Sequence, residues 1–412
     1  MHYLVTSVVP GMGEVNCGEL FCELRGGRET ATFRYSDQWM ACGYDLSPDM
    51  PLGPGTFFSS NGFGNLRAFA DAMPDRWGRN LLKRDESRRA AADRSTPRTL
   101  FESDYLVGVA DVSRQGSIRL WDEDGNALNA GRNAVPRVID LPKLLDAADR
   151  ASEDLDADVK DLVDAGSSLG GARPKASVLD LDGSLCICKL PRINETEERD
   201  VCAWEHVTVE IARNSGIDVP RARLVRLGDR SALLTARFDR DEKGRRIPYI
   251  SGMSAIEGND GGTYTLDTLV DFIEIYCKDP DHDCQELWKR ALLTCLVGNT
   301  DNHMRNYGFL RSEGGWRLSP QFDVNPTPWA QGARLASGLD RGNYSADPDL
   351  AMSLRECFRV SAEDARRFCK ALFASIARWR RIARADGLSE RSIASMAGCF
   401  DRAANWLEHT VK

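Results

Sequence analysis

Three polar residues between positions 301 and 323 have the types and the spacing needed for chemistry on a nucleotide. Asp301 is followed five residues later by Asn306, and Asp323 comes after a further stretch that is long enough for a short hairpin. Asp301 could accept the proton of a substrate hydroxyl, while Asn306 and Asp323 could hold magnesium against nucleotide phosphates. Magnesium prefers hard oxygen ligands and keeps several waters, so one amide and one carboxylate suffice beside the phosphates. The order of these residues predicts phosphoryl transfer from a nucleotide.

His303 lies in the same short segment, between Asp301 and Asn306. Its imidazole could hydrogen-bond the backbone of the loop, or it could approach the nucleotide. The residues alone leave both roles open. The general base is assigned to Asp301 rather than to His303 because Asp301 has the better spacing.

A glycine-rich segment, Gly-Ser-Ser-Leu-Gly-Gly-Ala-Arg-Pro-Lys, ends at Lys175, where a predicted strand begins. Gly170 and Gly171 permit positive φ and allow backbone N–H groups to approach phosphate oxygens closely. Ser167 or Ser168 could add a hydroxyl donor, and Lys175 a compact positive charge. The segment is neither a Walker A motif nor a G-x-G-x-x-G loop, so a plain glycine-rich turn is the alternative interpretation.

Lys189 ends an apolar strand, and Glu205 follows sixteen residues later inside a predicted helix. A lysine near the end of a strand often serves only to protect a sheet edge. A strand lysine that pairs with a helix glutamate and holds the α and β phosphates is, however, a recurring device of protein kinases. With Asp301, Asn306 and Asp323 downstream in the correct order, the whole set favours a kinase site.

The elements that must position these residues can be predicted from hydrophobic periodicity. Residues 1 to about 60 alternate apolar and polar positions between turns, which predicts a small antiparallel sheet. Helical periodicity follows from Leu66 to about Ala92, and residues 125–132 are the best candidate for a linker. Residues 141–165 predict one or two acidic helices.

A second strand-rich region begins near residue 176 and gives way to helices. Between its strands a helix is predicted from Ala203 to Asn214, closed by Gly216 and followed by Pro220. Strands are predicted at 176–179, 184–190, 222–227 and 231–237, and later helices from residue 266 and at 286–297, 362–385 and 390–407. Strands with one embedded helix, followed by a mainly helical half, predict an α+β fold with two lobes.

The composition describes an ordinary soluble protein. The 412 residues carry a net charge of −8, with 42% hydrophobic and 28% charged residues. No apolar run approaches the roughly 20 residues that span a bilayer, and the N-terminus has no positive segment typical of secretion, so a cytoplasmic protein is expected. The net charge argues against nucleic-acid binding by the whole surface; residues 76–98 are locally basic and predict a solvated amphipathic helix or, alternatively, a basic face for a partner.

The twelve cysteines are scattered and include no C-x-x-C pair, which indicates reduced and mostly buried thiols. Cys277, His282 and Cys284 form the one cluster with metal-ligand chemistry. They lack a fourth ligand at a sensible spacing, so no zinc site is expected there.

Several segments together resemble a known family. The sequences SSLGGARPK, CKLP, WEHVTVEIARNSGIDVP, TARFDR, NTDNHMRNYGF and LSPQFDVNP, with a looser match over residues 69–78, are similar to the HipA-like serine/threonine kinases of bacterial toxin–antitoxin modules. The resemblance covers nearly the whole chain. It implies a two-lobed, protein-kinase-like α+β fold with an N-terminal subdomain at 1–132, a kinase N-lobe at 133–240 and a helical C-lobe at 241–412.

The resemblance also implies roles for individual residues. Asp301 and Lys189 would be catalytic, Asn306 and Asp323 would bind Mg²⁺, and Ser168 or its neighbour Ser167 would be a site of self-phosphorylation that blocks the phosphate site by charge repulsion. The residues implied to contact ATP are Gly170, Gly171, Ala172, Arg173, Lys175, Lys189, Glu205, Ala236, Arg237, Phe238, His303, Asn306 and Asp323.

Three departures from the family pattern concern the nucleotide and substrate sides of the site. Ala236 replaces a common glutamate in the hinge that would hold adenine, mostly through backbone groups. The phosphate loop ends in ARPK rather than AQEK. Residues 249–257 replace an acidic segment that would shape the protein-substrate side of the cleft, so no particular target can be transferred.

The implied partners are a small helix-turn-helix antitoxin of the HipB type and a protein substrate of translation, such as an aminoacyl-tRNA synthetase. DNA would be bound only through the antitoxin. One alternative is a non-catalytic nucleotide-binding module that acts as a co-repressor with a DNA-binding antitoxin. A second alternative keeps the fold but transfers AMP from ATP bound in reverse, and the mass added to the target distinguishes it from phosphoryl transfer.

Overall fold

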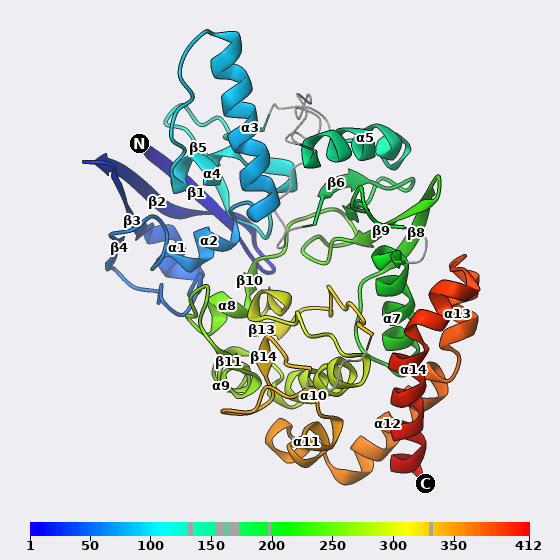
Figure 1. Cartoon of the computed structure of the whole chain (residues 1–412). Coiled ribbons are helices and arrows are strands. Elements are labelled where there is room, and N and C mark those ends of the chain that lie inside the picture. Colours follow the sequence, from blue (N-terminus) through cyan, green and yellow to red (C-terminus); the bar gives the residue numbers. More distant parts are fainter. Residues whose placement is uncertain (131–134, 154–161, 163–172, 197–198, 329–332) are drawn as a thin grey trace. The chain divides into compact units, whose positions relative to one another are not determined.

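The computed structural model describes residues 1–130, 135–153, 162, 173–196, 199–328 and 333–412 (Figure 1). The chain forms two compact units. Unit 1 comprises Met1–Ile193, Arg237–Ile250 and Leu310–Glu313, and unit 2 comprises Asn194–Ala236, Ser251–Phe309 and Gly314–Lys412. These units are defined by how closely their residues pack, which does not show whether either part folds independently. The expected domain boundaries at residues 132 and 240 therefore stay a prediction.

Unit 1 begins with an antiparallel sheet. Its strands are β1 (His2–Val9), β2 (Gly13–Arg25), β3 (Arg28–Tyr35), β4 (Thr56–Ser59) and β5 (Arg119–Trp121), in the spatial order β4-β3-β2-β1-β5. Leu20 and Phe33 face each other across β2 and β3 and are completely buried, as the alternating sequence requires. The sheet predicted for the first 60 residues is confirmed, and β5 joins it from a later part of the chain.

The helices of unit 1 are short apart from α3 and α5. They are α1 (Asp37–Cys42), α2 (Arg67–Asp71), α3 (Arg76–Ala92), α4 (Glu102–Gly108) and α5 (Leu141–Ser152). The single helical stretch expected from Leu66 to Ala92 is wrong in one respect, because the chain leaves the helix before Pro74 and α3 starts afresh with Asp75 as its N-cap. Proline disfavours a helical residue before it, which explains the break.

Two further expectations for unit 1 can be compared with the structure. The linker predicted at residues 125–132 is wrong for its first part, because Ala127 bridges to Trp121 and the Leu128 N–H donates to the Leu120 carbonyl, which folds this stretch onto β5. Residues 131 and 132 lie outside the described residues.

On α3, Arg88 and Arg89 both pair with Asp85. Of the two alternatives for the basic residues 76–98, these contacts favour a solvated amphipathic helix.

The later strands of unit 1 carry two of the predicted site residues. β6 (Lys175–Leu179) and β7 (Leu185–Lys189) form an antiparallel pair in which Lys175 faces Lys189 across the ladder. Both strands were predicted. β10 (Tyr249–Ser251) and β12 (Gly308–Ser312) each have residues in both units.

Unit 2 is mainly helical. Its strands are β8 (Ala222–Leu227), β9 (Arg230–Ala236), β11 (Tyr264–Thr265), β13 (Gly315–Leu318) and β14 (Ser337–Gly338), and its helices are α7 (Val201–Ser215), α8 (Gly252–Ala255), α9 (Leu266–Tyr276), α10 (Pro280–Val297), α11 (Pro348–Ser353), α12 (Ala362–Ile376), α13 (Trp379–Ala385) and α14 (Glu390–Val411). In Figure 1, α7, α12 and α14 lie side by side. Phe400 of α14 stacks on Trp204 of α7 and on Trp379 of α13.

The predictions for unit 2 are largely confirmed. α7 ends at Gly216 in the left-handed conformation, with φ of 86°, which only glycine adopts at no steric cost. The helix expected from residue 362 to 385 is instead α12 and α13, separated by a turn at Ala377 and Arg378. Within the described part of the chain, no helix is long and apolar enough to cross a membrane.

Candidate functional site

The loop that carries Asp301 follows α10 and is closed on itself. The Asp301 carbonyl accepts hydrogen bonds from the His303 N–H at 2.9 Å and from the Asn306 side-chain amide at 3.1 Å. The Asn306 N–H in turn donates to the His303 carbonyl at 2.8 Å. Asn306 is buried while Asp301 is exposed, so the loop presents the Asp301 carboxylate to solvent on a fixed backbone.

The segment that carries Asp323 is attached to the beginning of this loop. The side-chain amide of Asn299 donates to the Asp323 carbonyl at 3.3 Å. The Thr327 N–H donates to the Val297 carbonyl at 3.1 Å, and the Thr327 hydroxyl donates to the Gly298 carbonyl. The structure therefore brings the predicted base, the predicted amide ligand and the predicted carboxylate ligand onto two hydrogen-bonded segments of unit 2.

Asp323 has an unusual backbone conformation, with φ of 60°. This left-handed region is costly for a residue with a Cβ atom, and residues held in it gather at functional sites. One oxygen of the Asp323 carboxylate accepts a hydrogen bond from the Asn325 side-chain amide at 2.9 Å. The direction of the carboxylate is thus fixed by both its backbone and its neighbour.

A buried ion pair on α10 is hydrogen-bonded to the chain just before Asp323. Glu286 and Arg290 lie one turn apart, with the Arg290 Nε 3.0 Å from the Glu286 carboxylate, and Arg290 also donates to the Ser319 carbonyl at 2.7 Å. The Glu286 carboxylate accepts the Asp218 N–H at 2.9 Å, and the Asp218 carbonyl accepts the Gln321 N–H at 2.8 Å. Sequence analysis missed this pair, although a glutamate and an arginine four residues apart in a predicted helix could have indicated it.

The polar atoms of the loop fit a nucleotide with its magnesium. The Asn306 amide nitrogen donates to the Asp301 carbonyl, so a cation held by this side chain would bind the Asn306 amide oxygen. His303 Nδ1 is buried and has no hydrogen-bond partner among the described residues. A buried polar atom of this kind is normally satisfied, which is consistent with a ligand that approaches His303.

Glu205 lies on α7 in unit 2, where it is buried at 4% exposure. Lys189 ends β7 in unit 1. Because the two residues belong to different units, the predicted ion pair between Lys189 and Glu205 stays a prediction.

The phosphate-loop residues are only partly described. Gly170, Gly171, Ala172, Ser167 and Ser168 lie outside the described residues, while Arg173 directly precedes the described Pro174 and β6.

Lys175 is the last residue of that segment and the first of β6. It is buried, and its Nζ atom lies 3.3 Å from the Asp75 carboxylate at the start of α3. This contact leaves the predicted contact of Lys175 with phosphate untested.

The predicted hinge, residues 236–238, uses its backbone N–H groups in the fold. The Ala236 N–H donates to the Arg221 carbonyl at 2.8 Å, and the Arg237 N–H donates to the Leu185 carbonyl at 3.0 Å. The Phe238 ring packs near Tyr249, with ring centroids 6.0 Å apart. The N–H groups of Ala236 and Arg237 are therefore already hydrogen-bonded within the fold. These bonds do not test the predicted contact of the hinge with adenine.

The Arg237 side chain belongs to a buried arginine cluster of unit 1. Its guanidinium forms a bidentate pair with Asp239 and donates to the Ser113 carbonyl at 2.8 Å. Burial would raise the pKa of Asp239, but Arg237 and Arg240 hold that pKa well below its usual range. The Asp239 carboxylate also accepts the Gly116 N–H at 2.8 Å.

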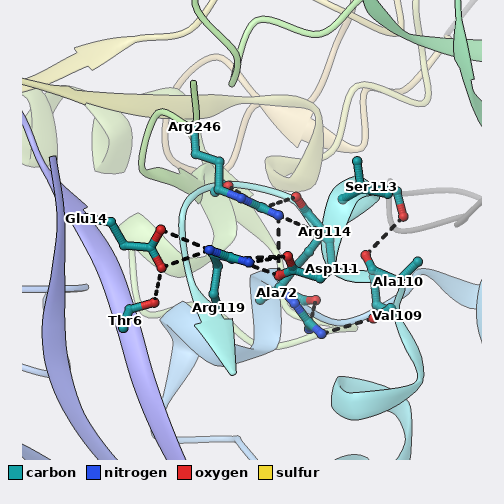
Figure 2. A network of polar contacts seen from close by, with 12 residues as sticks. Thr6, Glu14, Ala72, Val109, Ala110, Asp111, Ser113, Arg114, Arg119 and Arg246 are labelled. Atoms are coloured by element: carbon teal, nitrogen blue, oxygen red, sulfur yellow. Dashed lines mark hydrogen bonds and ion pairs between the residues drawn. The ribbon is translucent and has the colours of Figure 1, made fainter. Parts of the chain in front are cut away.

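Figure 2 shows the neighbouring part of this arginine cluster. Arg119 lies between the carboxylates of Glu14 and Asp111, and Arg246 approaches Asp111 from above in this view. Arg114 is completely buried and donates to backbone carbonyls, including that of Val109 at 3.0 Å. Burial lowers the pKa of Arg114 to about 10, so the guanidinium is still charged at neutral pH.

Comparisons with known proteins identify the family. The model of the HipA-like C-terminal domain matches residues 167–405, and that of the HipA N-terminal domain matches residues 12–101. The chain belongs to the HipA-like family. It is 21% identical over 351 residues to the serine/threonine-protein kinase toxin HipA of Shewanella oneidensis, a match that covers 76% of this chain and 73% of that protein.

Two further likenesses agree with this membership of the HipA-like family. A putative kinase of Haemophilus influenzae is 28% identical over 142 residues, which cover 30% of this chain and 41% of that protein. The structure of HipA from Shewanella oneidensis MR-1, in a complex with HipB and operator DNA, matches with a TM-score of 0.69 at 16% identity, over 99% of this chain and 97% of that one. The likeness shows the fold, and the α+β, kinase-like HipA fold predicted from the sequence is confirmed.

Proposed function

We propose that this HipA-like chain is an ATP- and Mg²⁺-dependent protein serine/threonine kinase. The observation that carries the proposal is the pair of hydrogen-bonded segments in unit 2 that hold Asp301, Asn306 and Asp323. The exposed Asp301 carboxylate lies on a loop closed by Asn306, and Asp323 is attached to the start of that loop through Asn299. The relatives named as kinases support the same chemistry.

Each residue has a role that its surroundings allow. Asp301 would accept the proton of the substrate hydroxyl as that oxygen attacks the terminal phosphate, a role that contributes on the order of 10² to 10⁴-fold in rate. The Asn306 amide oxygen and the Asp323 carboxylate would hold Mg²⁺, which neutralises charge on the phosphates when bound. Lys189 would contact the phosphates, and His303 would line the nucleotide.

The biological role that we propose is that of the toxin in a type II toxin–antitoxin module, acting in the cytoplasm. The solved relative is a complex with HipB and operator DNA, which supports a small helix-turn-helix antitoxin of the HipB type as the partner here. DNA would be reached through that partner. The substrate would be a protein of translation, with an aminoacyl-tRNA synthetase as one candidate, and the chain would also phosphorylate itself at Ser168 or Ser167.

Intact-mass spectrometry after incubation with Mg-ATP tests the proposal directly. We expect the wild-type protein to gain one phosphate that maps to Ser167 or Ser168, and Asp301→Ala to gain none. Asp301 is exposed, so this substitution should leave the fold intact, and thermal unfolding provides the check.

Other outcomes assign a different function. A gain equal to a nucleotide would replace phosphoryl transfer by AMP transfer. Nucleotide binding without any added mass, on the protein itself or on proteins of a lysate depleted of kinases, would indicate a non-catalytic co-repressor. An equal phosphate gain in Asp301→Ala would refute the role of Asp301.

A further inference from the structure

Asp75 makes a contact that the proposed phosphotransfer chemistry does not include. It precedes α3 as the N-cap residue, and one of its carboxylate oxygens accepts the Gly78 N–H at 2.8 Å. The other oxygen lies 3.3 Å from Nζ of Lys175, the first residue of β6. The two side chains are 4% and 6% exposed, so this contact joins two elements of unit 1 through a buried pair of opposite charges.

The register of β6 and β7 connects this pair to the phosphate site. Lys175 faces Lys189 in the antiparallel ladder, and residues that face each other this way have Cβ atoms about 5 Å apart on the same face. Two lysines at such positions repel each other unless a negative charge compensates one of them. Asp75 supplies that charge to Lys175, and the Leu190 N–H continues the ladder by donating to the Pro174 carbonyl at 2.8 Å.

We propose that Asp75 is a positioning residue for phosphate binding: its carboxylate holds the buried Lys175, so that Lys189, on the facing position, is the lysine presented to the ATP phosphates. The inference rests on the proposed function, because it assumes that ATP binds beside β7. Asp75 itself touches no reacting atom and acts through Lys175.

The surroundings of Asp75 give the contact a dependence on pH. Burial raises the pKa of Asp75 to about 6, against the opposing effects of Lys175 and of the Gly78 and Trp77 N–H groups. The neighbouring Arg79 donates to the Pro74 carbonyl and pairs with Glu102 of α4. Above pH 6 the carboxylate is ionised and holds Lys175, and below pH 6 it gains a proton and the charge pair is lost.

The substitution Asp75→Asn removes the negative charge of this side chain but keeps its ability to cap α3. Asparagine caps a helix as well as aspartate does, so α3 keeps its first hydrogen bond. The buried ammonium of Lys175 would lose the negative charge of Asp75, and a buried ammonium that loses a nearby negative charge has a lower pKa or moves from its site. The first rung of β6 and β7, and Lys189 with it, would then be displaced.

The experiment measures the Kd of Mg-ATP by calorimetry for the full-length wild type and for Asp75→Asn, at pH 7.5 and at pH 5.5. We expect Asp75→Asn to weaken binding about tenfold at pH 7.5, which corresponds to about 1.4 kcal/mol. The ratio of the two Kd values should fall toward one at pH 5.5. The ratio is the right quantity because the terminal phosphate of ATP also titrates in this range, and its effect cancels between the two proteins.

Two further variants complete the test. Asp85→Asn removes another buried carboxylate of α3, whose partners Arg88 and Arg89 lie on the same helix, and it should leave the Kd unchanged at both pH values. Asp75→Asn combined with Lys175→Met removes the buried ammonium as well and should recover part of the lost affinity, which would show that Asp75 acts through Lys175.

The possible results are distinct. A wild type that binds no Mg-ATP refutes the proposed function and this inference with it. A wild type that binds while Asp75→Asn binds equally well, or more tightly, at pH 7.5 overturns the inference alone. Weakened binding whose ratio does not change with pH, or that Lys175→Met fails to relieve, also overturns it, because a general loss of packing would produce both.

Discussion

At the scale of single residues, Asp323 combines a costly backbone with a carboxylate at the candidate metal position. An L-residue in the left-handed region costs roughly 1–2 kcal/mol relative to its usual conformations, and somewhat less for aspartate. The hydrogen bond from Asn325 and the attachment to Asn299 hold Asp323 there against this cost. Glycine would occupy the position more easily, so the carboxylate brings no conformational advantage and accords with the proposed role of Asp323 in binding Mg²⁺.

Asp323→Gly and Asp323→Ala therefore form a matched pair. Both remove the carboxylate, so both should abolish phosphate transfer from Mg-ATP. The glycine variant should be more stable than the alanine variant by about 1 kcal/mol, because only glycine accepts φ of 60° without strain. Urea unfolding measures this difference. Equal stability would contradict the strain, and retained transfer in either variant would contradict the role of the carboxylate.

The residues that carry chemistry could be found in the sequence because their types and order are specific. Asp301, Asn306 and Asp323 were predicted together, and the structure places them on two bonded segments. The residues that hold those segments, such as Asn299 and Thr327, could not be predicted. Their partners are backbone carbonyls, which leave no trace in the identity of any side chain.

At the scale of elements, α10 supports the site through charges that it buries. Glu286 and Arg290 are nearly inaccessible, and Arg290 reaches the Ser319 carbonyl just ahead of the Asp323 segment. Glu286→Ala would leave Arg290 buried and unpaired, which should reduce the free energy of unfolding by about 3–5 kcal/mol. Glu286→Leu combined with Arg290→Met should cost less than Glu286→Ala, and chemical denaturation measures all three proteins.

The exposed pair Arg384 and Glu390 is the control for this prediction. Glu390→Gln removes the same kind of charge from a solvated position and should leave the midpoint of thermal unfolding unchanged. A Glu286→Ala variant as stable as wild type would show that α10 does not depend on the buried pair.

The junction of α7 and α13 should make stability depend on pH. Burial lowers the pKa of His206, but the hydrogen bond and charge of Asp386, 2.8 Å away, outweigh it, so the pKa is raised overall. A raised pKa means that the stabilisation is complete below pH 6.5 and is lost as pH rises through the folded-state value.

Thermal unfolding of wild type and Asp386→Asn between pH 5.5 and 8.5 measures this effect. The midpoint difference between the two proteins should be largest at pH 5.5 and should shrink as pH rises. A difference that stays constant, or that grows toward pH 8.5, would contradict the contribution of protonated His206.

Element types were predictable wherever periodicity was strong, as in β6, β7, α7 and α14. The errors fell at interruptions. Pro74 divides the helix expected from Leu66, and the turn at Ala377 and Arg378 divides the one expected from residue 362. Pro74 could have been used as a signal. The second break has no such signal, because Ala377 and Arg378 both favour helices and tertiary packing decides there.

At the scale of the whole molecule, the two compact units are interleaved along the chain. Residues 237–250 return to unit 1 after a stretch of unit 2, and they bring Arg237, Arg240 and Arg246 with them. These arginines bind the carbonyls of Ser113, Arg114 and Gly116 and the carboxylates of Asp111 and Asp239. The order of the predicted helices and strands gave no indication that residues 237–250 pack with unit 1.

A fragment of residues 1–193 should therefore fail to form native unit 1. It would contain the acceptors at 111–116 without the arginines that satisfy them, and buried carbonyls without donors are costly. We expect it to show no cooperative thermal unfolding and rapid cleavage by trypsin after Arg114, which is completely buried in the full chain. Cooperative unfolding of the fragment, with Arg114 protected, would contradict this.

Arg237, Arg240 and Arg246 bind several main-chain oxygens of residues 111–116, and every amino acid carries the same carbonyl. Arg240, for example, reaches the Val112 carbonyl at 3.1 Å, while Val112 as a residue is 46% exposed. Val112 can therefore change during evolution without a matching change at Arg240. Arg240 has no such freedom, because lysine lacks the fork of donors that serves several carbonyls at once. A comparison of homologous sequences should find a near-invariant Arg240 facing a freely varying position 112, with no covariation between the two.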